Sequence, residues 1–168
     1  MSERFLERLF EHNNWANAKI VEACAALSDE QLDAEPRSAT KGSIRATLLH
    51  LVASQQGYLS LLTSTANDRL DARPSYDQLQ EVARRSGEEL LALARGESSR
   101  SLQEQLQTRD GYFVEPWVVM VQVINHATEH REQINSMLSA LGVTPLELDG
   151  WSYGEAAGAL VPASGSEP

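Results

Sequence analysis

His126 and His130 stand four residues apart in the run VINHATEHREQINSML, in which aliphatic and polar residues recur at helical spacing. Residues four apart are neighbours on one face of a helix, so both imidazoles can point at one ion that lies over the turn between them. Two ligands do not complete a metal site, and helical bundles add further ligands from a facing helix. The pair therefore predicts part of a metal site.

The only other histidine inside an apolar helical run is His50, in TLLHLVASQQGYLSLL. Ser54 and Gly57 follow it by one and two turns on the same side, and such small residues leave space for an open coordination position. His12, in FEHNNWAN, is expected on the polar side of its helix or at a pocket rim, and not on the metal. From spacing alone, these histidines could equally be hydrogen-bonded residues on half-buried faces.

The residues His126, Glu129 and His130 also spell H-x-x-E-H, the inverted zinc-protease signature. That signature belongs to a large α/β peptidase fold with an acidic ligand well downstream, whereas fewer than forty residues follow His130 here. The mirror motif H-E-x-x-H is absent because Ala127 stands where its glutamate would be. A protease is therefore not expected.

Helical spacing of apolar residues predicts four long helices that would carry these histidines. Their expected ranges are about Glu3–Leu27, Ser43–Thr63, Ser75–Gly96 and Pro116–Leu141. The apolar stripe of the first is formed by Phe5, Leu6, Leu9, Ile20, Cys24 and Leu27. Four amphipathic helices without convincing strands indicate an all-α fold, a four-helix bundle with short extra helical turns, one of them at the capping box of Ser28 and Gln31.

The remaining segments are expected to be irregular. The run ESSRSLQEQLQTRDGYFV has no clear period and predicts a long connection, with an irregular hairpin that turns at RDGY. The run LELDGWSYGEAAGALV is expected to fold back on the bundle as a C-terminal tail. We expect one domain over residues 1–160 and disorder over 161–168.

Composition narrows the function classes. The formal charge of -10 on 168 residues, with no lysine and arginine cluster, argues against nucleic acid as a partner. No apolar run approaches the roughly 20 residues that span a bilayer, and the charged start MSERFLERLF is unlike a signal peptide, so we expect a cytoplasmic protein without membrane contact. Cys24 is expected to be a small buried hydrophobe and not a catalytic thiol.

Three segments resemble, in order and spacing, the DinB/YfiT-like family of bacterial four-helix-bundle proteins: NNWANAKIVEACAALSDEQL, GSIRATLLHLVASQQGYL and VINHATEHREQINSMLSALGVTPLELD. The most specific parts are the run Asn13–Asn17, the histidine of the second helix and the block His126–Ile134. In that family one histidine of the second helix and two of the last long helix bind a divalent metal. The resemblance implies one zinc, nickel or iron ion per chain, held by His50, His126 and His130.

The resemblance also implies a function. Characterised relatives are transferases and isomerases that use bacillithiol, mycothiol or glutathione, which suggests a metal-dependent thiol S-transferase or related detoxification enzyme acting on a small molecule. Many family members have no assigned reaction, so the alternative is a non-enzymatic stress-response metal-binding protein. The family shares its name with an unrelated DNA polymerase, and no polymerase activity follows from it.

Trp15, Tyr58 and Tyr153 are the aromatic residues expected to wall a substrate pocket, with the Tyr153 hydroxyl in contact with substrate. Glu129 and Glu132 stand where many family members have histidine and glycine. These two acids could orient a ligand imidazole or be ordinary surface charges, and we favour the second reading.

Homodimers are common in the family, and the resemblance therefore implies a homodimer here. Leu49, Val52 and Leu91 lie off the expected core stripes and are predicted to be exposed apolar positions that a partner would cover.

Overall fold

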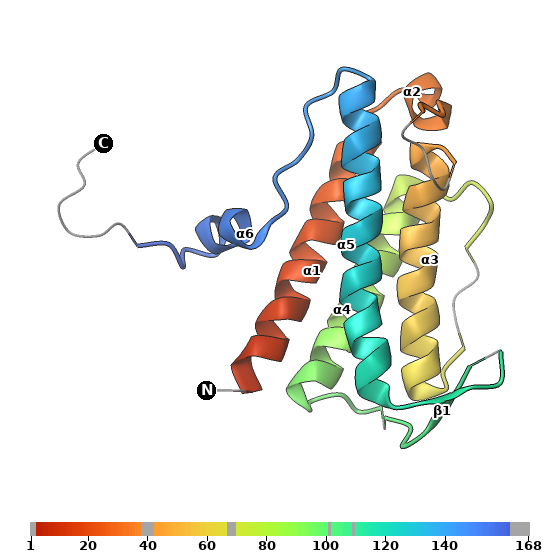
Figure 1. The fold of residues 1–168 in the computed structure, drawn as a ribbon, viewed down its shortest axis with the longest axis vertical. Helices are drawn as coiled ribbons and strands as arrows, with labels where there is room; N and C mark the ends of the chain where they lie inside the picture. Colours follow the sequence, from red (N-terminus) through yellow and green to blue (C-terminus); the bar gives the residue numbers. More distant parts are fainter. Residues whose placement is uncertain (1–2, 38–41, 67–69, 101, 109, 162–168) are drawn as a thin grey trace.

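A computed structural model of the chain describes residues 3–37, 42–66, 70–100, 102–108 and 110–161. Its four long helices are α1 (Glu3–Ala25), α3 (Ile44–Thr63), α4 (Tyr76–Arg95) and α5 (Pro116–Ala140). The shorter elements are α2 (Asp29–Asp33), β1 (Leu106–Gln107), β2 (Phe113–Val114) and α6 (Gly150–Ala156). The fold is the all-α bundle that the sequence predicts (Figure 1).

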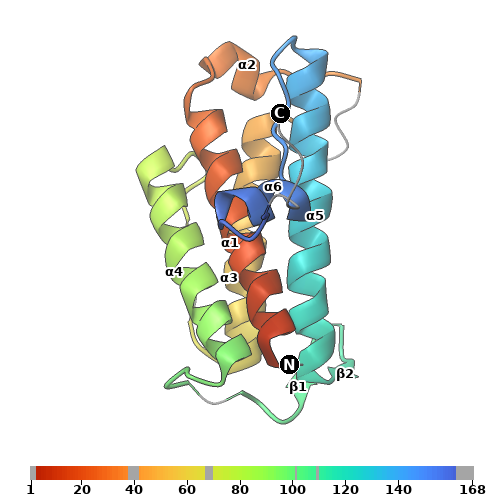
Figure 2. The same cartoon turned by 90° about the vertical axis from the view of Figure 1, so that its left-hand side faces the viewer.

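The four long helices pack around a common axis in the order α1, α4, α3, α5, so that each contacts two neighbours. α1 and α5 run in one direction and α3 and α4 in the other (Figures 1 and 2). Because α3 and α4 are parallel, the chain must return along the length of the bundle between them. Among the described helices, none has both the length and the apolar character needed to cross a bilayer.

Local side-chain chemistry explains why α2, α3 and α4 begin where the sequence predicts. The Ser43 and Ser75 hydroxyls accept hydrogen bonds from the backbone N–H groups of the third helical residues, Ala46 and Gln78. Ser28 and Gln31 form the predicted capping box in both directions. These contacts satisfy backbone donors that the first turn of a helix leaves without partners.

The apolar core consists of two clusters, one at each end of the bundle. The cluster at the α2 end includes Ile20, Cys24, Leu32, Leu48, Leu51, Ile134 and Met137. The cluster at the β-hairpin end includes Phe10, Leu59, Leu62, Leu90, Leu106 and Val123. Buried polar side chains lie between the two clusters along every long helix, and we call five of them the buried polar layer: Asn13, Asn17, Gln55, Ser86 and Arg131.

The prediction of a buried apolar stripe at the start of α1 is wrong. Phe5, Leu6 and Leu9 are 71%, 40% and 49% exposed, whereas Phe10 is fully buried. The face of α1 that points into the bundle runs from Phe10 through the buried Asn13 and Asn17 to Ile20. Because two of these residues are polar, a search for apolar residues at helical spacing does not find this face.

The prediction that three apolar residues off the core stripes are exposed also needs correction. Val52 is buried at 2% exposure and packs within the core cluster at the α2 end, because that side of α3 is covered inside the bundle. Leu49 and Leu91 are half-buried against the two clusters. None of the three is a fully exposed apolar position.

The connection before α5 contains the predicted irregular hairpin. β1 and β2 pair antiparallel, with Leu106 opposite Val114, and Gly111 takes the left-handed conformation at φ 85° in the turn. The segment after α5 folds back as expected, since the Asn135 amide bonds both the N–H and the C=O of Leu146. The expected disorder at 161–168 falls, from residue 162 on, outside the described residues.

α1 and α4 are in close contact at Gly87. The Asn14 side chain donates from Nδ2 to the Gly87 carbonyl oxygen at 2.9 Å. A Cβ atom added at Gly87 would lie 2.5 Å from Asn14 Oδ1, closer than van der Waals contact allows. A larger residue at this position would therefore have to displace the Asn14 side chain.

We predict that Gly87→Ala lowers the free energy of unfolding by about 1 kcal/mol. Displacing Asn14 removes a hydrogen bond and crowds the interface, at a cost of about 1–3 kcal/mol. Alanine offsets about 1 kcal/mol of this through its higher helix propensity. Urea unfolding followed by circular dichroism measures the net effect.

The matched control is Gly87→Ala in an Asn14→Ala background. There the collision partner is gone, and the same substitution should be neutral or stabilising by up to about 1 kcal/mol. Equal destabilisation in both backgrounds would show that the Asn14 contact is not the reason for glycine.

Candidate metal centre

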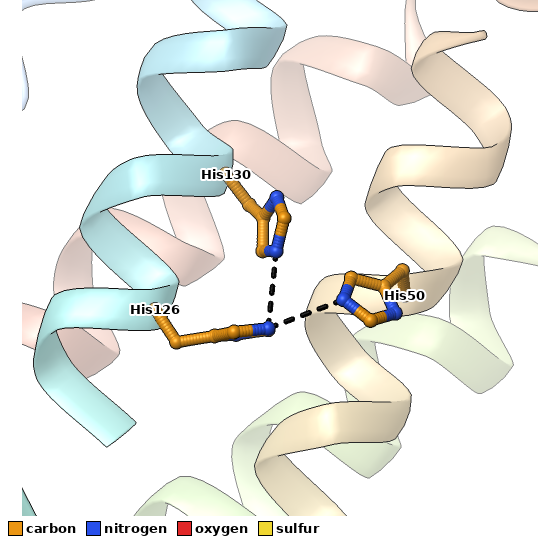
Figure 3. A group of neighbouring side chains, drawn as sticks. All are labelled: His50, His126 and His130. Atoms are coloured by element: carbon orange, nitrogen blue, oxygen red, sulfur yellow. Dashed lines mark hydrogen bonds between the residues drawn. The ribbon is translucent and has the colours of Figure 1, made fainter. Parts of the chain in front are cut away.

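The three predicted metal ligands come together between α3 and α5 (Figure 3). His126 Nε2 lies 3.1 Å from His50 Nε2 and 3.0 Å from His130 Nε2. The candidate ligand atoms of these residues all lie within 4.8 Å of one another. We call His50, His126 and His130 the histidine triad. Two neighbouring antiparallel helices thus bring together residues that are 76 positions apart in the sequence.

The geometry fits three imidazole ligands of one ion. Two nitrogens that are each about 2.0–2.1 Å from a divalent metal lie about 2.9–3.4 Å apart, for angles between octahedral and tetrahedral. The two measured separations, 3.0 and 3.1 Å, fall in this range. Three close imidazole nitrogens are also the donor type that zinc, nickel and iron accept. The residues present could therefore hold a metal ion.

The triad is closed on one side and open on the other. His130 is 1% exposed, His126 is half-buried and His50 is exposed to solvent. Two turns along α3 from His50, a Cβ atom added at Gly57 would meet no atom within 4 Å. Open space therefore adjoins one of the two small residues predicted to leave room for a ligand, and the exposed His50 is on the open side of the triad.

His130 has a polar partner that the sequence did not reveal. Its Nδ1 lies 2.7 Å from Gln133 Oε1, and Gln133 Nε2 lies 3.2 Å from Glu129 Oε1. Glu129 is exposed, as its interpretation as a surface charge expects, and the Gln133 amide links it to the triad. Glu132 is exposed, as that interpretation expects.

The Arg131 side chain lies inside the bundle, next in sequence to the buried histidine. Arg131 is 2% exposed and donates from Nη1 to Asn13 Oδ1 at 2.9 Å and to Asn17 Oδ1 at 2.6 Å. Its Nη2 donates to Thr128 Oγ1 at 3.0 Å. Burial lowers the pKa of the Arg131 guanidinium to about 10, so it remains charged at neutral pH.

These bonds extend to the other two long helices. Asn17 Nδ2 donates to Gln55 Oε1 at 2.8 Å, and Gln55 Nε2 donates to the Ala83 carbonyl and to Ser86 Oγ at 2.8 and 2.7 Å. The buried polar layer therefore joins α5 to α1, α3 and α4. Asn13 and Asn17, the first and last residues of the Asn-x-Trp-Ala-Asn run, belong to this layer, and sequence reasoning gave them no role.

Of the expected pocket aromatics, only Tyr58 lies at the triad. The Tyr58 ring meets the His126 ring edge-on, with centroids 5.5 Å apart, and the Tyr58 hydroxyl accepts a bond from Gln122 Nε2 at 3.5 Å. Trp15 and Tyr153 instead contact each other, with ring centroids 5.5 Å apart.

That second aromatic cluster forms where α6 covers the outer side of α1, away from α3 (Figures 1 and 2). His12 belongs to it, and its Nε2 lies 2.7 Å from the Leu148 carbonyl oxygen. The Tyr153 hydroxyl donates to Glu11 at 3.4 Å. The structure thus places His12 away from the triad, as expected, and does not bring Trp15 or Tyr153 to it.

Cys24 is fully buried, and burial raises the pKa of its thiol to about 12. A thiol with this pKa is neutral and unreactive at physiological pH. The prediction of a small buried hydrophobe is confirmed.

The comparison with curated proteins returned no match. A family model described as the DinB family matches residues 1–165, nearly the whole chain. The chain belongs to the DinB family.

Proposed function

We propose that this protein binds one divalent metal ion through His50, His126 and His130 and uses it to transfer a low-molecular-weight thiol to a small electrophile. The observation that carries the metal site is that His126 Nε2 lies 3.1 Å from His50 Nε2, across two helices, and 3.0 Å from His130 Nε2. Zinc, nickel and iron all suit this donor set. The transferase activity rests on what the family resemblance implies.

The chemistry of the site supports this proposal. Three neutral imidazoles leave the charge of a bound divalent ion uncompensated, so the ion would act as a Lewis acid that lowers the pKa of a coordinated thiol. Buried His130 excludes water from one side, and the open space beside Gly57 admits a thiol from the other. A cytoplasmic location, where small thiols are kept reduced, suits such a reaction.

Tyr58 is the residue best suited to contact the second substrate. Its ring packs edge-on against His126, and its hydroxyl, which accepts a bond from Gln122, keeps a proton to donate. We propose that Tyr58 forms one wall of the substrate site and donates a hydrogen bond to the electrophile.

The metal site makes a stoichiometric prediction. Protein purified without chelators should hold about one divalent ion per chain by elemental analysis, and the triple alanine variant of the histidine triad should hold none. His12→Ala is the matched control, because His12 lies in the aromatic cluster at α6, and it should retain the metal.

His50→Ala guards against a folding artefact. His50 is exposed, so this variant should keep its helicity while its metal affinity falls. Stoichiometric metal in a folded triple variant would show that the ligands are elsewhere.

The transferase proposal predicts conjugate formation between an activated electrophile and bacillithiol, mycothiol or glutathione in the presence of metal. His126→Ala should abolish this activity with helicity intact. Tyr58→Phe should lower turnover about three- to tenfold, the worth of one hydrogen bond, and leave metal affinity unchanged.

Tyr112→Phe is the control for Tyr58→Phe, because Tyr112 is 71% exposed in the β-hairpin. A metal-loaded protein that accelerates no thiol transfer with any of the three thiols would favour a non-enzymatic metal-binding protein.

We also propose a homodimer. Phe5, Leu9 and Val121 are 71%, 49% and 49% exposed on the early turns of α1 and α5, which are neighbouring parallel helices. Such apolar surface suits a partner subunit.

Light scattering should give twice the mass of one chain for the wild type. The double variant Leu9→Glu with Val121→Glu should give the mass of one chain, and a wild-type monomer at micromolar concentration would contradict the proposal.

A further inference from the structure

Three hydrogen bonds link four side chains of α5 in a chain that ends within the triad. Glu129 Oε1 is 3.2 Å from Gln133 Nε2, Gln133 Oε1 is 2.7 Å from His130 Nδ1, and His130 Nε2 is 3.0 Å from His126 Nε2. Glu129 is exposed, Gln133 is half-buried and His130 is buried. The chain therefore runs from the protein surface to the most enclosed ligand of the triad.

The chemistry of the donors and acceptors determines the direction of this chain. A carboxylate only accepts hydrogen bonds, so Glu129 requires the NH₂ group of the Gln133 amide to face it. The amide oxygen must then face His130, and an oxygen at 2.7 Å requires a proton on Nδ1. A neutral imidazole with a proton on Nδ1 carries its lone pair on Nε2.

Nε2 is also the nitrogen of His130 that faces the other two imidazoles. The surface carboxylate thus selects the tautomer whose lone pair points to the centre of the triad. Ligating histidines generally hold their second nitrogen in this way, and losing the partner typically weakens metal binding about 10- to 100-fold.

We infer that Gln133 and Glu129 are positioning residues for the metal centre: Gln133 fixes the tautomer and ring orientation of His130, and Glu129 fixes the orientation of the Gln133 amide. This inference rests on the proposed metal site. The competing explanation is that Gln133 and Glu129 form an ordinary i, i+4 surface pair, which would contribute a few tenths of a kcal/mol to helix stability and nothing to the metal.

The two explanations differ in zinc affinity, measured by competition with a chromogenic chelator. Gln133→Met keeps the side-chain length but removes the acceptor, and it should weaken zinc binding about 10- to 100-fold. Gln133→Glu restores an acceptor for the Nδ1 proton and should bind clearly more tightly than Gln133→Met. Glu129→Gln leaves an amide that can face Gln133 either way, and it should weaken binding by a smaller factor.

Glu132→Gln is the matched control. Glu132 is exposed on the same helix, and its replacement removes the same charge as Glu129→Gln. Glu132 takes no part in the chain of bonds described above. Its zinc affinity should stay within about twofold of wild type, whereas a loss equal to that of Glu129→Gln would assign the Glu129 effect to net charge alone.

A second readout does not depend on any variant. Nitrogen-15 NMR of metal-free wild-type protein at mildly alkaline pH should find the His130 proton on Nδ1, and a proton on Nε2 would overturn the inference.

Zinc affinity of folded Gln133→Met within about twofold of wild type would also overturn it, provided His130→Ala loses binding. Wild-type protein that binds no zinc would instead refute the proposed metal site, a result reached before any variant is made.

Discussion

The burial of the Arg131 guanidinium is the constraint on which the rest of the bundle depends. A charged group in a protein interior is tolerated only when its donors are hydrogen-bonded, and all the described partners of Arg131 are neutral side-chain oxygens. Two of them come from α1, so α1 must present Asn13 and Asn17 at this level of the bundle. Asn17 in turn engages Gln55 on α3, which engages α4.

This polar layer has a consequence for the triad. Hydrophobic attraction is non-directional, whereas a network of directional hydrogen bonds favours one register of α5 against α1 and α3. With Arg131 directed into the bundle, the preceding His130 is held at the α5 face toward α3, where His50 lies. The same residues that separate the two apolar clusters therefore also position His130 of the triad.

The helices were predictable because serine caps and the helical spacing of apolar residues are local signals. The four-residue spacing of His126 and His130 is local too, whereas the assignment of His50 to the same site rested on the family resemblance. The layer around Arg131 was not predictable, because an asparagine has the same appearance in a sequence whether it faces water or a buried guanidinium. The position of Tyr153 was missed for another reason. α6 is placed by bonds such as those of Asn135 to Leu146, which carry no periodic pattern.

The most direct test of the account is anomalous X-ray diffraction at the zinc edge from crystals of the zinc-loaded protein. We expect one strong peak per chain, between α3 and α5, about 2.0–2.1 Å from the Nε2 atoms of His50, His126 and His130. A zinc ion bound by other residues, or bound to these histidines through Nδ1, would contradict the account.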